Sequence, residues 1–187
     1  MPKPVYFDTS IFIEMGTKRS KYATKLRTLL KDLHDRKIRI YTSILTVQEL
    51  SVAAHRKGTL ARDTMGDVHA IARVATITKE IALTAAKREA ELKDIAEDNE
   101  KKRDKKKPLT KEQEIERICE NRRRKWDCIH IATAQALGCS TIYSTDADLQ
   151  KRPKQLGIKH LEIISPPESM KKVTGPLIDF AAQSEPE

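Results

Sequence analysis

The chain has 187 residues, of which 39% are hydrophobic and 34% charged, and its formal net charge is +9. This length fits one domain with room for an insertion, and the positive charge favours a polyanionic partner, with nucleic acid as the first candidate. Aromatic residues make up only 4% of the chain, which disfavours a base-stacking aromatic platform, and no apolar run approaches the roughly 18 residues of a membrane-spanning helix.

The first half of the chain predicts strands that alternate with helices. Its expected elements are a buried strand at 5–7 that leads into a loop, a helix at about 19–36, a strand at 38–41, a helix capped by Ser43 and ended by Gly58, a short helix at 59–70 and an extended connector at 74–77.

The second half contains two longer helical patterns and two strands. Its expected elements are a helix capped by Thr78, a helix that restarts after Pro108 with a Thr110–Gln113 capping box and ends at Gly138, a strand at 141–144 with Asp146 and Asp148 in the loop beyond it, and a strand at 161–164. This alternation predicts an α/β domain over residues 1–165, with a central parallel sheet of four or five strands and helices on both faces. Residues 166–187 are expected to be a polar C-terminal tail.

The three cysteines and the N-terminus indicate a cytoplasmic protein. Cys119, Cys128 and Cys139 are odd in number and contain no Cys-x-x-Cys pair, so we expect reduced, mostly buried thiols. No signal peptide is apparent, because the N-terminus leads directly into the first strand.

Four acidic patches are the most informative feature of the sequence. Their acids are Asp8, Glu49, Asp127 and the pair Asp146 and Asp148, each within or beside an apolar stretch. Asp8 and Asp146 follow strands, and ligands bind beyond the carboxyl ends of parallel strands. Carboxylates that the fold brings together repel one another, so a divalent cation would stabilise them, and oxygen ligands suit Mg²⁺ or Mn²⁺.

Each acid also has a purely structural interpretation. Asp8 is in a position to cap a turn, and Glu49 has capping-box spacing from Thr46. Asp127 fits a first-turn acid stabilised by the helix dipole, unless its helix already begins before it. Asp146 and Asp148 fit an Asx turn or an N-cap.

These patches resemble the PIN-domain ribonucleases, and within them the VapC-type toxins of bacterial toxin–antitoxin pairs. The matching segments are 8–10, 43–50, 127–134 and 144–149, within a resemblance that covers residues about 4 to 165. The resemblance implies an RNA substrate and Mg²⁺ or Mn²⁺ held by Asp8, Glu49, Asp127 and Asp146, with Asp148 as a further contributor. It places the hydroxyls of Thr9, Ser10 and Thr145 beside the acids, where they hold a bound water or a phosphate oxygen; Thr145 fits equally well as a residue that ties its loop together.

A charged segment interrupts this resemblance. Residues 99–125 carry twelve Lys or Arg and six Asp or Glu, a net charge of +6. The segment fits either a solvated helical hairpin or an inserted arm that binds the RNA backbone. Its candidate RNA-binding residues are Lys101, Lys102, Arg103, Lys105, Lys106, Lys107, Arg122, Arg123, Arg124 and Lys125.

The sequence therefore predicts a metal-dependent endoribonuclease whose products carry 5′-phosphate and 3′-hydroxyl ends. It leaves open one cation or two, and a toxin with an antitoxin partner or a processing enzyme. Two other classes stay open: a catalytically silent RNA-binding module on the same fold, and a structure-specific DNA nuclease. Family resemblance implies a homodimer, for which residues 11–13 or the helix from about residue 20 are candidate apolar surfaces.

Overall fold

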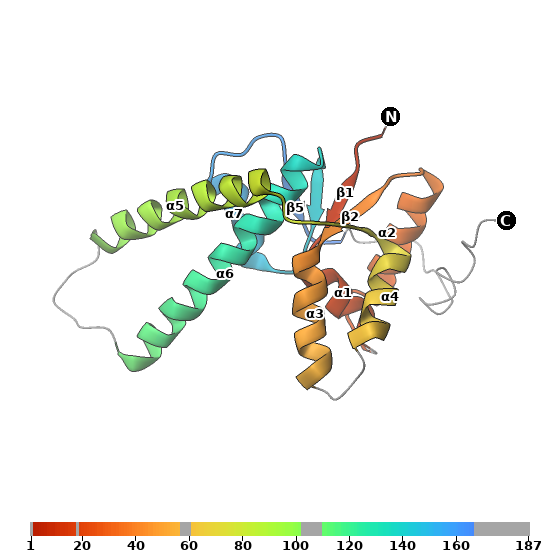
Figure 1. Ribbon diagram of the computed structural model, residues 1–187, viewed down its shortest axis with the longest axis horizontal. Coiled ribbons are helices and arrows are strands. Elements are labelled where there is room, and N and C mark those ends of the chain that lie inside the picture. The colour runs from red at the N-terminus through yellow and green to blue at the C-terminus, as the bar shows by residue number, and fades with distance from the viewer. Residues whose placement is uncertain (1, 18, 57–60, 102–109, 167–187) are drawn as a thin grey trace.

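The computed structural model describes residues 2–17, 19–56, 61–101 and 110–166, which form an α/β fold (Figure 1). Its five strands are β1 (Val5–Phe7), β2 (Ile40–Ser43), β3 (Arg73–Ala75), β4 (Thr141–Tyr143) and β5 (Glu162–Ile164). All neighbouring strands are parallel, and their order is β3-β2-β1-β4-β5. The prediction of a parallel sheet of four or five strands is confirmed.

Seven helices surround this sheet in the described part of the chain. They are α1 (Thr9–Gly16), α2 (Ala23–Asp35), α3 (Ile44–Arg56), α4 (Ala61–Ile71), α5 (Lys79–Lys101), α6 (Lys111–Ala136) and α7 (Ala147–Gln155). None of the helices described here is long and apolar enough to cross a membrane.

Side chains of strand β1 alternate between two hydrophobic clusters, because successive residues of a strand point to opposite faces of the sheet. Val5 and Phe7 belong to a cluster with buried residues of α1, α2, α3 and α4. Tyr6 belongs to a second cluster, with Ile131 of α6 and Leu149 of α7. Helices therefore cover both faces of the sheet, as the sequence predicts.

Helices α5 and α6 pack against each other near the sheet and extend away from it (Figure 1). Their contact is a third apolar cluster, in which Ile81, Ala85 and Leu92 meet Cys128 and Ala132. The described parts of the charged segment at 99–125 are the end of α5 and the first part of α6, and residues 102–109 lie outside the described chain. The domain limits that we expect for this segment as an insertion stay a prediction.

Several helix caps confirm the sequence prediction. The Thr78 hydroxyl accepts a hydrogen bond from the backbone N–H of Ile81 at 3.3 Å. Thr110 and Gln113 form the expected capping box at the start of α6, and Gly138 has the left-handed φ of 67° that favours glycine after a helix.

Three local predictions were wrong. Residues 74–77 were expected to be a connector, but β3 pairs with β2 and adds a strand to the sheet. The loop expected after β1 is instead the start of α1, capped by Asp8. Asp146 lies in the loop after β4, as expected, and caps α7, whereas Asp148 belongs to that helix. Ser43 does not cap α3, because it ends β2 and its hydroxyl is buried without a hydrogen-bond partner. Pairing with a neighbouring strand and burial, which a local pattern does not encode, decide these outcomes.

The strand order places a topological switch point beside β1. The chain runs outward from β1 through β2 to β3, and then returns to β4 on the other side of β1. In open parallel sheets, ligands bind in the crevice beyond the carboxyl ends of strands at such a point. Asp8 directly follows β1, and Asp146 lies three residues after the end of β4, so both are at this crevice.

Candidate functional site

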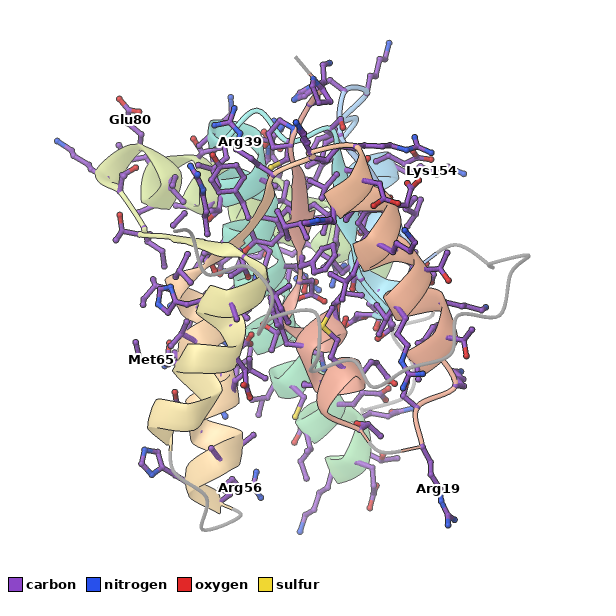
Figure 2. All side chains as sticks on the ribbon, turned by 90° about the vertical axis from the view of Figure 1, so that its right-hand side faces the viewer. Arg19, Arg39, Arg56, Met65, Glu80 and Lys154 are labelled. Carbon is purple, nitrogen blue, oxygen red and sulfur yellow. The ribbon has the colours of Figure 1, made fainter. Side chains whose placement is uncertain are left out.

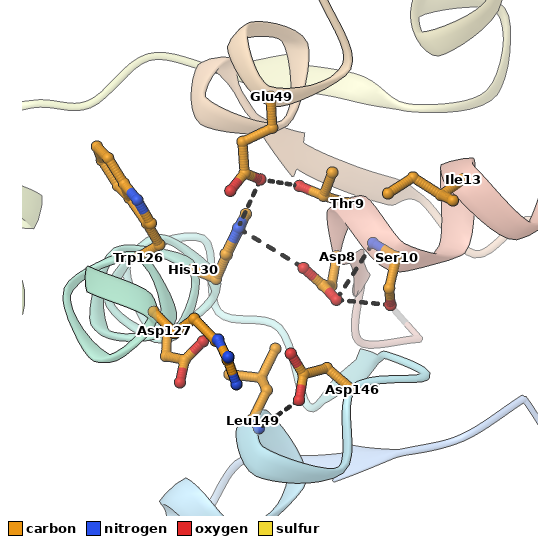
Figure 3. A pocket seen from close by; sticks show the side chains of 11 residues that line it. Asp8, Thr9, Ser10, Ile13, Glu49, Trp126, Asp127, His130, Asp146 and Leu149 are labelled. Atoms are coloured by element: carbon orange, nitrogen blue, oxygen red, sulfur yellow. Dashed lines mark hydrogen bonds and ion pairs between the residues drawn. The ribbon is translucent and has the colours of Figure 1, made fainter. Parts of the chain in front are cut away.

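The crevice contains a cavity of about 250 Å³ that four acids from four separate elements line. Asp8 is the N-cap of α1, Glu49 belongs to α3, Asp127 to α6, and Asp146 is the N-cap of α7. Figure 3 shows these four side chains around one opening. The structure therefore brings together the four predicted acids, which are spread over 139 positions of sequence.

Asp8 is almost completely buried and is held by hydroxyl groups. Its Oδ2 accepts hydrogen bonds from the side chains of Ser10 and Ser144, each at 2.7 Å. The Ser10 hydroxyl also accepts a hydrogen bond at 2.9 Å from the backbone N–H of Thr145. These bonds connect the start of α1 to the segment between β4 and α7 and fix the direction of the Asp8 carboxylate.

Glu49 lies in the second turn of α3 and faces the same cavity. Its Oε2 accepts a short hydrogen bond from the hydroxyl of Thr9. Burial acts to raise the pKa of Glu49, but the contacts with His130 and Thr9 outweigh it and lower that pKa. The capping-box alternative was wrong, because Thr46 lies inside α3 and its hydroxyl accepts a hydrogen bond from Thr42.

His130 lies between Asp8 and Glu49 at the base of the site (Figure 3). Its Nε2 is 3.6 Å from Oδ1 of Asp8 and 3.6 Å from Oε2 of Glu49. Its Nδ1 is hydrogen-bonded to the hydroxyl of Tyr6 at 2.7 Å. Burial alone would lower the pKa of His130, but Tyr6, Glu49 and Asp8 raise it well above its usual value. A protonated His130 compensates part of the negative charge of the two acids.

Asp127 is buried in the middle of α6 and is paired with an arginine of α7. The Nε of Arg152 donates to Oδ2 of Asp127 at 2.9 Å, and the same guanidinium donates to Glu120 at 2.8 Å. Burial raises the pKa of Asp127 to about 6; the nearby charge of Asp146 adds to the rise, while Arg152 and His130 oppose it. Since α6 begins sixteen residues earlier, at Lys111, the interpretation of Asp127 as a first-turn acid was wrong.

Asp146 and Asp148 are two residues apart in sequence, but only Asp146 lines the cavity. The Oδ1 of Asp146 accepts hydrogen bonds from the backbone N–H groups of Asp148 and Leu149, so the predicted N-cap is confirmed. Asp148 does not line the cavity; it pairs with Lys151 at 2.8 Å, and this bond holds the pKa of Asp148 below its usual value. Thr9 and Ser10 line the cavity, whereas Thr145 does not.

The donor chemistry of the cavity fits a divalent cation, but the present side-chain directions do not yet form a site. In the described part of the chain, no three Asp, Glu, His or Cys side chains come close enough to hold one ion. Asp8 is turned to its serines, Asp127 to Arg152 and Asp146 to the backbone of α7. Because the four oxygen donors line one cavity, reorientation of these side chains toward its centre would present them to Mg²⁺ or Mn²⁺.

The predicted RNA-binding residues on α6 differ in their exposure to solvent. Arg122, Arg123 and Lys125 are exposed, and Arg123 also lines the cavity. Arg124 is buried and lies 3.8 Å from Glu120, because it shares the inward face of α6 with Asp127 and Cys128, three and four residues later. Arg124 is therefore not available to RNA. The side chain of Lys101 and the residues Lys102, Arg103, Lys105, Lys106 and Lys107 lie outside the described part of the chain.

Sequence reasoning did not single out three residues that shape this site: His130, Arg152 and Ser144. His130 falls within the motif segment after Asp127 but has no metal-ligand spacing with another histidine. Arg152 is one of several basic residues in α7, and only its burial separates it from Lys154, which points outward (Figure 2). Ser144 follows a strand, and a serine at such a position is only a weak indication of a functional site, because many of these serines simply stabilise turns.

The surfaces that we considered for a homodimer are mostly core. Ile11 and Phe12 are buried in the cluster beneath α1, and three of the four leucines of α2 (Leu26, Leu29 and Leu33) are buried in the same cluster. Ile13 is the exception, with 51% of its surface exposed. All three cysteines are free, as expected; Cys128 and Cys139 are buried, and only Cys119 among them is exposed.

Comparison with known proteins agrees with this geometry. A family model described as PIN domain matches residues 5–155. A search of curated proteins found no match. The matched segment includes all four acids of the cavity and most of the described chain.

Proposed function

The chain belongs to the PIN-domain family, a family of nucleases that generally use divalent metals, and on this basis we propose that it is a Mg²⁺- or Mn²⁺-dependent endoribonuclease. The observation that carries this proposal is the convergence of Asp8, Glu49, Asp127 and Asp146 on one cavity at the switch point of the sheet. Four carboxylates in one partly buried cavity destabilise one another unless a cation compensates them.

The four acids hold the metal in this proposal, and the chain supplies their directions. With a divalent cation bound, these acids would have at hand a Lewis acid able to activate water and to neutralise charge on a phosphodiester. Ser10 and Ser144 orient Asp8, Thr9 and His130 orient Glu49, and Arg152 orients Asp127. The hydroxyls of Thr9 and Ser10 line the cavity, where they are available to a water or a phosphate oxygen.

An RNA substrate is supported by the charge of the chain and its placement. The net charge is +9, and the exposed side chains of Arg122, Arg123 and Lys125 lie immediately before Asp127 on α6. Basic residues so close to the acids offset the repulsion between the cavity and the phosphates of a nucleic acid. The basic residues of 101–107 extend this charge along the sequence.

The toxin of a toxin–antitoxin pair is the narrower form of this proposal. It requires an antitoxin, and a protein that inserts a basic side chain among the four acids would fit the charge of the cavity. A processing enzyme with the same chemistry needs no such partner, so copurification of a tightly bound inhibitor supports the toxin.

Cleavage of a mixed RNA pool tests the proposed activity. Purified full-length chain is incubated with Mg²⁺ or Mn²⁺, beside an EDTA control and an Asp127→Asn variant. We expect metal-dependent cleavage that the variant lacks, with 5′-phosphate products. Cleavage that survives both EDTA and the substitution contradicts the proposal, and a DNA pool of the same sequences tests the choice of RNA.

Two observations favour a second candidate, the catalytically silent RNA-binding module. Arg152 already neutralises Asp127, and in the described chain no three ligand side chains converge on one point. Binding of RNA without cleavage in either metal, from a preparation that mass spectrometry shows to be free of other proteins, would support this candidate.

A further inference from the structure

We propose that Trp126 and Ile13 form two apolar rims that receive unpaired nucleobases on either side of the phosphate at the acids. In Figure 3 the two side chains lie on opposite sides of the carboxylates, and both line the cavity. This inference rests on the proposed nuclease function and deepens it by naming the side chains that contact the bases beside the scissile phosphate.

Trp126 is placed on the cavity rather than in the core. Its ring lines the cavity and is only half-buried, and it is not among the side chains of the three apolar clusters of the described chain. It is the only tryptophan of the chain, which has few aromatic residues. The composition argument against an extended aromatic platform therefore still holds, but one correctly placed ring is enough to stack one base.

Ile13 is an exposed apolar side chain that lines the cavity on the α1 side. It lies on α1 next to Phe12, which is buried, yet 51% of its own surface is exposed. It is five residues from Asp8, so one short helix positions both an acid and an apolar side chain at the cavity. An exposed apolar side chain at the edge of a polar cavity is suited to the face of a base.

The charges beside Trp126 select a polyanion as the occupant. The Nζ of Lys125 lies 5.5 Å from the centre of the Trp126 ring. Arg123 lines the cavity with 55% of its side chain exposed, and its guanidinium is 3.9 Å from a carboxylate oxygen of the partly exposed Asp148. A base on the indole therefore places its phosphate near two cationic groups. Paired bases are covered by their neighbours in a helix and cannot present a free face to a rim, so the occupant is unpaired.

Tryptophan fluorescence tests the inference directly, because the emission reports on Trp126 alone. The full-length chain is titrated with a short single-stranded RNA in Ca²⁺, with a gel to verify that the RNA stays intact, and then with the same RNA annealed to its complement. We expect saturable quenching by the single strand and at least about tenfold weaker quenching by the duplex. No quenching at RNA concentrations where filter binding shows saturation, or equal quenching by the duplex, overturns the proposal.

Substitutions separate stacking from charge. Trp126→Leu should weaken single-strand binding roughly 5- to 100-fold at every salt concentration, and Trp126→Phe should stay close to wild type. Arg123→Gln should instead reduce the slope of log affinity against log salt by about 0.7, the value for one phosphate contact on a single strand. Equal binding by Trp126→Leu and wild type overturns the role of the indole, and the wild-type titration decides the question if this variant does not fold.

Ile13→Ser has a matched control in Val52→Ser, because Val52 is 52% exposed on α3 and does not line the cavity. We expect roughly 3- to 10-fold weaker binding for Ile13→Ser and no change for Val52→Ser; equal effects contradict the second rim.

Cleavage of the RNA is measured separately from the quenching of Trp126. Quenching without metal-dependent cleavage contradicts the proposed nuclease alone, and cleavage without quenching contradicts this inference alone.

Discussion

The guanidinium of Arg152 holds the carboxylate of Asp127 through an Nε–Oδ2 hydrogen bond of 2.9 Å between two buried side chains. The same guanidinium donates to Glu120 and to Gln155, so it connects α7 to the part of α6 that belongs to the charged segment. An arginine stays charged at any ordinary pH, and it thus supplies a permanent positive charge beside a proposed metal ligand.

Removal of Arg152 should therefore destabilise the fold through the charge that it leaves behind. We expect Arg152→Met to lower the free energy of unfolding by about 3–5 kcal/mol at pH 7, because Asp127 and Glu120 lose a buried partner. Lys154→Met on the same helix is the matched control, since Lys154 is exposed. Urea denaturation of both variants, and of Arg152→Met combined with Asp127→Asn, measures the coupling; additive effects would contradict a direct pair.

Stability should depend on pH through Asp127. Burial raises the pKa of this acid from 3.8 to about 6, so the fold favours the protonated form. Its contribution to the free energy of unfolding is fully present below about pH 4 and is lost as the pH rises through 6, a change of about 3 kcal/mol for a two-unit shift. Urea denaturation in EDTA from pH 4 to 7 measures it, and Asp127→Asn should remove this part of the curve. Parallel curves for wild type and variant would disprove the assignment.

Asp8 combines a structural role with a proposed catalytic one, and two substitutions separate them. Asparagine caps helices about as well as aspartate, so Asp8→Asn should change stability by less than about 1 kcal/mol while cleavage falls on the order of 100-fold or more. Asp8→Ala should lose both cleavage and the cap, which contributes about 1 kcal/mol. The exposed Asp94→Asn on α5 controls for net charge. Wild-type cleavage rates in Asp8→Asn would remove Asp8 from the proposed quartet.

The Tyr6 hydroxyl should contribute to stability through His130. Tyr6→Phe leaves Nδ1 of the buried His130 without its 2.7 Å partner, which predicts a loss of about 1–3 kcal/mol. Thermal or urea denaturation measures this change, with Tyr22→Phe outside the cavity as control. A loss of the same size in the control would show that the hydroxyl of Tyr6 has no specific role.

The basic run is expected to act through phosphate contacts. Replacement of Lys101, Lys102, Arg103, Lys105, Lys106 and Lys107 by glutamine should weaken RNA binding and reduce the salt slope for a single strand by up to about 4. The matched control neutralises six exposed basic residues around α2: Arg19, Lys21, Lys31, Arg36, Lys37 and Arg39. An unchanged slope in the first variant would leave the segment as a solvated hairpin.

The sequence by itself determined the fold class and the acids. Short apolar runs at 5–7 and 141–143 between helical patterns are enough to predict a parallel sheet, because strand and helix periodicities differ. The topological rule then places Asp8 and Asp146 at one edge before any coordinates exist. Capping residues such as Thr78 and Thr110 were also predictable, since caps are local interactions.

Only the tertiary structure decided what each acid contacts and which basic residues are free. Arg124 and Arg123 are adjacent and chemically identical, yet one is buried against Glu120 and the other opens onto the cavity. Arg152 reaches Asp127 across 25 positions, and Tyr6 reaches His130 across 124. Such pairs depend on the packing of α6 and α7 against the sheet, and burial then sets their charge, because the desolvation of a group depends on the whole fold around it.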